Sequence, residues 1–175
     1  MGLGDSKQMA TSIVVPKGAL TMQTRARNDI DNYFDKRAPL PGEQRNVDDL
    51  IAKYWNTKPR TRTPSAHYDC HGLTFASRRS GITQSTVVRQ ILADDGYQAV
   101  ALADVLPGDT IVYAGDLGEI EHSGIVVGLI YISGGSGRVL DTIVVSKWGG
   151  AHEVIHRSKD CPWANSKQEY YRMPK

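Results

Sequence analysis

The spacing of apolar residues changes near Gly96, and this change restricts the possible folds more than any other feature of the sequence. Before Gly96, apolar side chains recur at the spacing of one helix face. After it, short runs rich in Val and Ile are separated by glycine-containing turns, as in a strand-rich segment. Helices followed by strands are typical of an α+β domain. We therefore expect a helical N-terminal half packed on a small antiparallel β-sheet.

The individual elements follow from the same patterns and from capping residues. Helices are expected over residues 27–36 and 47–55, the latter capped by Asn46, and from Cys70 to near Gly81. A fourth helix is expected to begin at Thr83 or Ser85 and to close at Asp94-Asp95-Gly96. Strands are expected over residues 12–15, 110–113, 122–132, 138–148, 153–156 and 170–172, with a loop over 58–65. Residues 1–26 lack a clear period and are predicted to be a flexible N-terminal arm, and residues 27–175 a single domain.

Composition excludes several classes of function. The formal net charge is only +2, so nothing indicates a nucleic-acid partner, and the basic cluster at residues 58–62 is expected in a solvated loop. We see no run long enough for a transmembrane segment and no signal peptide, so we expect a soluble protein, cytoplasmic or delivered by a dedicated secretion route. Two cysteines, Cys70 and Cys161, are too few for a disulfide scaffold or a four-thiolate site, and we expect no metal and no cofactor. The sequence does not indicate an oligomeric state.

Cys70 and His122 form a candidate catalytic pair. Cys70 opens a predicted helix, and a helix N-terminus favours the thiolate form of a cysteine. The unpaired backbone N–H groups at that helix start could also bind a developing oxyanion. His122 opens an apolar strand about fifty residues later and could act as the base. The alternative is a buried helix cysteine and a strand histidine that never meet.

Three motifs that occur in one order make this pair more specific. They are Asp69-Cys70-His71-Gly72-Leu73, then Leu106-Pro107-Gly108-Asp109-Thr110-Ile111-Val112-Tyr113, then His122-Ser123-Gly124-Ile125-Val126-Val127-Gly128. Over residues 68–156 the chain resembles the NlpC-like branch of the papain-fold cysteine peptidases, which includes the related CHAP amidases. The resemblance implies a papain-like fold, with Cys70 as nucleophile and His122 as base.

The resemblance also implies a third polar residue on the next strand, which orients the imidazole. Ser146 falls near that position and is our candidate third catalytic residue, although a backbone carbonyl or His152 could serve instead. By strand alternation Ser146 shares a face with Trp148. His156 and Glu153 come later in the sequence and are expected to be structural.

Four residues are candidates for substrate binding: Tyr68, Asp69, His71 and Trp148. Tyr68 and Asp69 stand beside the nucleophile, and Asp69 could bind a substrate amine or cap the helix. His71 replaces the small serine of the family pattern, and it either contacts substrate or points outward. Trp148 either packs in the core or lines a groove.

These features predict a cysteine hydrolase that cleaves peptide or amide bonds through a thioester, with bacterial cell-wall peptidoglycan as the first candidate substrate. The glycine- and tyrosine-rich segment that many cell-wall relatives carry before the cysteine is absent. Its absence leaves open a deamidase, transglutaminase or acyltransferase that modifies a protein partner. A non-catalytic binding module on the same fold is a third hypothesis, because a serine such as Ser146 orients an imidazole only weakly.

Overall fold

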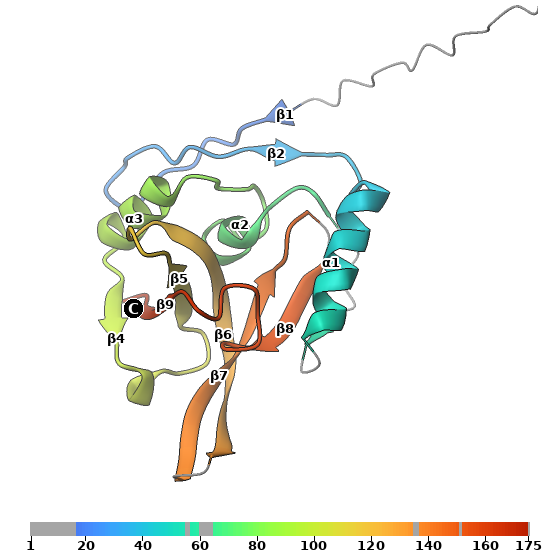
Figure 1. Ribbon diagram of the computed structural model, residues 1–175. Helices are drawn as coiled ribbons and strands as arrows, with labels where there is room; N and C mark the ends of the chain where they lie inside the picture. Colours follow the sequence, from blue (N-terminus) through green and yellow to red (C-terminus); the bar gives the residue numbers. More distant parts are fainter. Residues whose placement is uncertain (1–16, 55–56, 60–64, 135–136, 151, 175) are drawn as a thin grey trace, which may run out of the picture.

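The structure is a computed structural model that describes residues 17–54, 57–59, 65–134, 137–150 and 152–174. Within these residues the chain forms three α-helices, a seven-stranded antiparallel sheet and a two-stranded ribbon (Figure 1). The predicted α+β class with an antiparallel sheet is therefore confirmed. The strand predicted over residues 12–15 lies outside the described residues.

The helices precede most of the strands in the sequence. They are α1 (Pro41–Lys53), α2 (Cys70–Phe75) and α3 (Ser85–Asp94), and a short 3-10 turn spans Leu102–Asp104. Helices α2 and α3 correspond to the predicted third and fourth helices, although α2 ends well before Gly81.

All pairs in the large sheet are antiparallel, and their spatial order is β3-β8-β7-β6-β5-β9-β4. Their bounds are β3 (Lys58–Pro59), β4 (Gln98–Val100), β5 (Thr110–Ala114), β6 (Ile120–Gly134), β7 (Gly137–Lys147), β8 (Glu153–Arg157) and β9 (Lys167–Arg172). The five predicted strands after Gly96 are present. The edge strands β3 and β4 were not expected, and β3 occupies part of the stretch predicted as a loop.

Helix α1 covers one face of the sheet. Its buried Val47 belongs to an apolar cluster with Tyr113 of β5, Val144 of β7 and Trp148, and Trp163 packs against the same cluster. Side chains alternate along a strand, and the cluster accordingly takes Ile111 and Tyr113, two residues apart, from β5, together with Val126 of β6.

Helices α2 and α3 cover the opposite face. Leu73 of α2 packs with Val145 of β7, and Val88 of α3 packs with Val112 of β5. Val144 and Val145 are neighbours in the sequence, yet they belong to the clusters of opposite faces. The sheet is therefore the middle layer, and a one-residue step along a strand moves a side chain from one face to the other.

The helix predicted over residues 27–36 is wrong. Phe34–Asp35 forms strand β2, which pairs with β1 (Lys17–Gly18). Tyr33 exchanges two backbone hydrogen bonds with Gly81, at 3.0 and 2.6 Å. The aromatic residues that recur at helical spacing therefore belong to extended chain that pairs with other segments.

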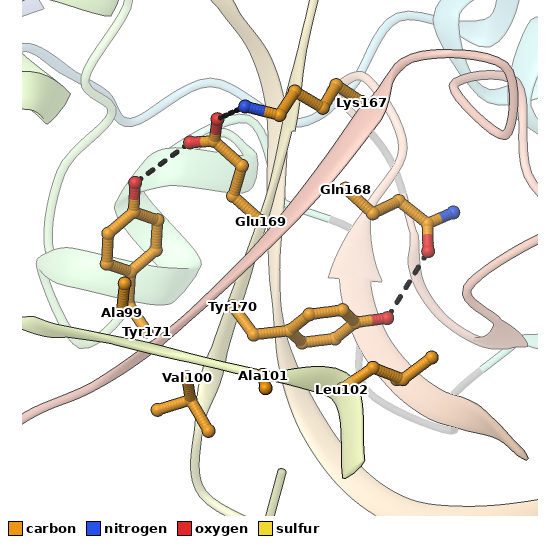
Figure 2. Close-up of a pocket in the computed structure, with 9 residues that line it drawn as sticks. All are labelled: Ala99, Val100, Ala101, Leu102, Lys167, Gln168, Glu169, Tyr170 and Tyr171. Carbon is orange, nitrogen blue, oxygen red and sulfur yellow. Dashed lines mark hydrogen bonds and ion pairs between the residues drawn. The ribbon is translucent and has the colours of Figure 1, made fainter. Parts of the chain in front are cut away.

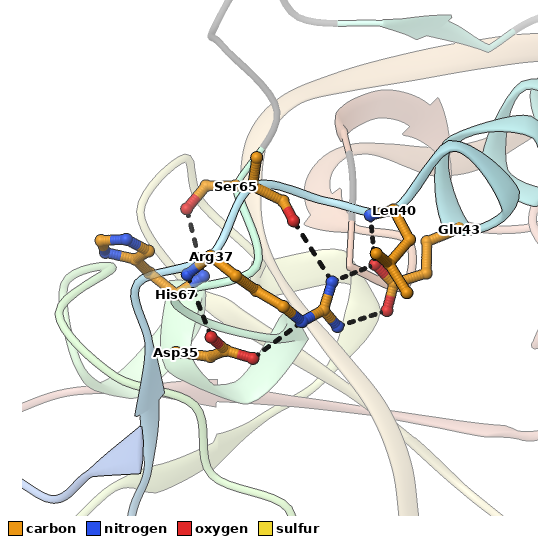
Figure 3. A network of polar contacts seen from close by, with 7 residues as sticks. Asp35, Arg37, Leu40, Glu43, Ser65 and His67 are labelled. Carbon is orange, nitrogen blue, oxygen red and sulfur yellow. Dashed lines mark hydrogen bonds and ion pairs between the residues drawn. The ribbon is translucent and has the colours of Figure 1, made fainter. Parts of the chain in front are cut away.

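The prediction that Asn46 caps the next helix is also wrong, because α1 begins at Pro41. Proline suits the first helical position, where its missing N–H would have no partner. A Glu43 oxygen accepts from the backbone N–H of Leu40 at 2.8 Å, and both Glu43 oxygens accept from Arg37 at 2.6 Å (Figure 3). These bonds fix the start of the helix before Asn46.

The described part of the predicted N-terminal arm, residues 17–26, packs on the domain. The Thr24 hydroxyl donates to Asp94 at 2.8 Å, and the backbone N–H of Arg25 donates to Asp95 at 2.7 Å. Met22 packs against the apolar cluster of α3. The contacts of the domain therefore begin before the predicted boundary at residue 27.

Candidate active site

Cys70 is the first residue of α2, and Asp69 is its N-cap. One Asp69 oxygen accepts from the backbone N–H of Gly72 at 2.7 Å, and the carboxylate also accepts from the N–H of Ile82 at 3.0 Å. Burial raises the pKa of Asp69, while these backbone bonds lower it. Of the two roles considered for Asp69, the structure shows the capping role.

A cleft of about 400 Å³ lies beside the start of α2. Tyr68 and Asp69, which precede the cysteine, line it together with Tyr33. Burial raises the pKa of Tyr33 to about 12; the negative charge of Asp69 contributes to the rise, and so does Cys70 at the high pH at which its thiol ionises. Cys70 therefore lies near the Tyr33 wall of the cleft. The remaining lining residues are Asp35, Arg37, Glu43, Ala66, Thr83, Gly149 and Gly150.

The Cys70 thiol is not activated in this conformation. The residue keeps some exposed surface, but burial of its side chain, together with the negative charge of Asp69, raises the pKa to about 12. Backbone N–H groups of Ser123, His71 and Cys70 itself lower the pKa only in part. The helix start therefore does not compensate for desolvation, and the thiol is protonated at neutral pH.

Lys147 is a functional candidate that the sequence analysis did not single out. It is 1% exposed at the end of β7, and its ammonium lies 4.7 Å from the centre of the Tyr68 ring. Burial lowers its pKa to about 8, although the charges of Glu153, Asp69 and Cys70 act to raise it. The sequence could have identified this candidate. Strand alternation puts Lys147 on the face opposite Ser146, and a lysine at the end of an apolar strand is an unusual residue there.

Glu153 connects Lys147 to α2. It is the cross-strand partner of Lys147 on β8 and is 2% exposed. Its carboxylate accepts from the Tyr68 hydroxyl at 2.6 Å and from two nitrogens of Arg78 at 2.5 and 3.2 Å. These hydrogen bonds to a buried carboxylate fix Tyr68 at the cleft. The sequence analysis expected Glu153 to be structural; its contacts lie at the candidate site.

The structure does not bring His122 to Cys70. Ser123, the next residue, faces α2, where its hydroxyl donates to Thr74 at 3.0 Å. His122 consequently points toward the α1 face and stacks on Trp163, with ring centroids 3.6 Å apart. It is fully buried, burial lowers its pKa well below 6.5, and neither ring nitrogen has a partner among the described residues. The expected hydrogen-bonded Cys70–His122 pair is therefore absent from the described residues.

Ser146 is bound to His156 rather than to His122. The Nδ1 of His156 lies 2.7 Å from the backbone carbonyl oxygen of Arg157 and must donate to it, so its Nε2 accepts from the Ser146 hydroxyl at 2.8 Å. Trp148 donates its indole N–H to the Ser146 oxygen at 3.0 Å. These bonds belong to the core on the α1 face, where burial lowers the pKa of His156 to about 4.

Two of the predicted substrate-binding residues are also absent from the cleft. His71 is 4% exposed, and its Nδ1 lies 2.8 Å from the Ser123 hydroxyl, so it joins α2 to β6 and neither points outward nor lines the cleft. Trp148 is fully buried in the core, where its ring packs edge-to-face on Tyr54. Tyr68 and Asp69 are therefore the predicted binding residues that line the cleft.

His152 and Cys161 lie elsewhere. The Nε2 of His152 is 3.4 Å from Asp48 of α1. Cys161 is a free, buried thiol whose sulfur donates to the Ser158 carbonyl. No group of three or more His, Cys, Asp or Glu side chains that could hold a metal ion occurs in the described ranges.

A second groove, of about 500 Å³, is lined by the paired strands β4 and β9 and by residues 101–102, which follow β4 (Figure 2). The polar side of the groove is formed by Glu169, whose carboxylate accepts hydrogen bonds from Lys167 and from the Tyr171 hydroxyl, both at 2.8 Å. Its lining residues are 99–102 and 167–171, whereas Cys70 lies on α2 over β6 and β7. This groove is therefore separate from the candidate active site.

No protein-family model, curated protein or solved structure matches this chain. Among the described residues, no helix is long and apolar enough to cross a membrane.

Proposed function

We propose that the chain is a cysteine hydrolase of peptide or amide bonds on a papain-like, NlpC-type fold, with Cys70 as nucleophile and Lys147 as proton acceptor. The observation that carries the proposal is the buried Lys147 amine, which lies 4.7 Å from the centre of the ring of Tyr68, a lining residue of the cleft, and whose pKa burial lowers to about 8. Lys147 replaces the base that the family resemblance implied, because His122 faces α1. The cysteine-bearing helix on an antiparallel sheet supports the finer fold assignment.

The proposed reaction proceeds through a thioester. Neutral Lys147 accepts the Cys70 proton as the sulfur attacks the substrate carbonyl carbon, and the carbonyl oxygen becomes an oxyanion. When the intermediate collapses, the C–N bond breaks and the leaving amine takes the proton from Lys147. Water then attacks the thioester carbonyl carbon and gives its proton to Lys147. The C–S bond breaks, the acid product leaves, and Lys147 returns the proton to the Cys70 sulfur. Bacterial cell-wall peptide is the first substrate class to test.

The two cysteines provide a matched test of the nucleophile. Cys70→Ala is expected to abolish cleavage of peptidoglycan fragments and small amides, while Cys161→Ala retains it. Intact-mass analysis of the products distinguishes hydrolysis from acyl transfer or deamidation. Equal turnover in wild type and Cys70→Ala would exclude Cys70 as the nucleophile.

One observation favours a second candidate, a non-catalytic binding module. The pKa of Cys70 is raised to about 12, and the imidazole expected to activate it points to the other face. For a binding module, Cys70→Ala binds the same peptides with unchanged affinity, and no product forms even with wild-type protein. Calorimetric titration with peptidoglycan fragments, followed by mass analysis of the same samples, separates the two candidates.

A further inference from the structure

The hairpin of β6 and β7 extends beyond the strands that flank it, as Figure 1 shows. Strand β5 pairs with β6 only as far as Ile125, whereas β6 continues to Gly134. Strand β8 pairs with β7 only from Ile143 onward, whereas β7 begins at Gly137. We call residues 127–134 and 137–141 the arm.

The side chains of the arm are unusually apolar for a solvent-exposed ribbon. Five large apolar residues on it are between 37% and 63% exposed: Val127, Leu129, Ile130, Tyr131 and Val139. Ile130 and Tyr131 are sequence neighbours, so both faces of the ribbon carry apolar surface. Exposed apolar patches of this kind mark interaction sites, and isolated two-stranded hairpins are only marginally stable.

The outer edge of β6 in the arm lacks the usual protection against pairing. Natural edge strands carry lysines, prolines or inward-pointing charges that block other strands. Residues 127–134 include no charged residue and no proline. The open edge presents unpaired N–H and C=O groups with which a strand of another chain can pair, whereas lipid offers no such partners.

We propose that the arm is a homodimer interface, in which the β6 edges of two copies pair antiparallel and continue the sheet from one copy to the other. A two-fold contact of this kind covers both open edges at once. Because the edge is uncharged, two identical edges meet without like-charge repulsion. The apolar side chains of both copies pack on the shared ribbon.

The arm offers a small contact area for a dimer. The exposed side chains and edge backbone offer on the order of 400–600 Å² per copy, below the ~800 Å² per partner of a standard interface. We therefore expect a weak dimer whose population depends on protein concentration.

The test compares two apolar-to-lysine variants by sedimentation equilibrium over a concentration series. Wild type is expected to rise from 19.2 kDa toward twice that mass. Tyr131→Lys, on the arm, is expected to remain monomeric. Leu117→Lys, at a residue that is 94% exposed in the β5–β6 turn, is expected to dimerise like wild type. Circular dichroism melting confirms that each variant is folded.

Three outcomes would overturn the proposal. The first is a wild-type protein that stays monomeric throughout the series. The second is an equal loss of dimer in Leu117→Lys and Tyr131→Lys. The third is a monomer in solution that binds phosphatidylcholine vesicles through Tyr131, which would assign the arm to a lipid surface.

Discussion

Lys147 shows how burial lowers the pKa of a lysine. A lysine in water has a pKa near ~10.4 and is almost fully protonated at neutral pH. Enclosed between β7, β8 and Tyr68, the amine of Lys147 has a pKa of about 8, so a measurable fraction is neutral. The neighbouring carboxylate of Glu153 keeps the pKa of Lys147 from falling further, because it favours the charged ammonium.

The first prediction concerns the pH dependence of activity. A base acts in its unprotonated form, so kcat/KM should rise as the pH increases through about 8 and then level off. Lys147→Met should lower kcat/KM by about 10²–10⁴-fold and remove this rise. Lys159→Met, at an exposed position, is the matched control. A rise with the same midpoint in Lys147→Met would assign it to another group.

The second prediction concerns Glu153. Glu153→Gln removes a negative charge that raises the pKa of Lys147, so the midpoint of the pH–rate profile should move to lower pH. The same change leaves Arg78 without its buried charged partner and should lower the free energy of unfolding by about 3 kcal/mol. Exposed Glu119→Gln should change neither quantity. A midpoint that stays in place or rises in Glu153→Gln would contradict the coupling.

The sequence placed Cys70 correctly at a helix start but could not place His122. Local patterns define a helix terminus, and alternation correctly put Ser146 on one face with Trp148. Which face α2 covers depends on tertiary packing, and there Ser123 rather than His122 meets the helix. Because α2 covers this face of the sheet, Lys147, which lies on the same face, is at the candidate active site.

At the scale of elements, α2 packs so closely against neighbouring backbone that only glycine fits at position 72. A Cβ at Gly72 would lie 1.9 Å from the Ser80 carbonyl oxygen and 3.0 Å from the Tyr68 Cβ. Backbone cannot yield to such a contact unless the helix moves. The position of Cys70 therefore depends on Gly72.

Gly72→Ala is expected to destabilise the protein by about 2–3 kcal/mol and to reduce turnover by displacing Cys70. Gly42→Ala in α1 is the control, because a Cβ there meets nothing within 4 Å. That change should stabilise by about 0.5–1 kcal/mol, as alanine favours the helix. Urea unfolding measures both, and equal effects at the two glycines would refute the close packing of α2.

Two predictions about secondary structure are wrong: the helix over residues 27–36 and the start of the next helix at Asn46. Tyr33 and Phe34 follow a helical period, yet both belong to extended chain that pairs with Gly81 and with β1. Asn46 is a good capping residue by type, but Pro41 and Glu43 start α1 earlier. Periodicity and capping preferences are local, whereas these partners come from distant or competing segments.

At the scale of the whole molecule, three buried histidines make stability depend on pH. Burial lowers the pKa of His71 and of His156 to about 4, and that of His122 well below 6.5. In the unfolded chain each has a pKa near ~6.5. The neutral forms therefore stabilise the fold fully above pH ~6.5, and this contribution is lost as the pH falls toward 4.

The expected loss approaches ~4 kcal/mol per pH unit when unfolding takes up three protons. Urea unfolding at pH 7.5, 6 and 5 measures it. Carboxylates do not produce the loss in this range, because those with a lowered pKa, such as Glu43 at about 2, respond only at lower pH. An unfolding free energy that is equal at pH 7.5 and pH 5 would contradict the prediction.

The position of β9 in the sheet has a consequence for synthesis on the ribosome. Strands β4 and β5 are close in sequence, yet β9 lies between them and pairs with both. A nascent chain that has emerged only to residue 160 holds β4 without its partner and β5 with one edge open. Chaperones that recognise exposed strands should therefore remain bound until residues 167–172 leave the exit tunnel.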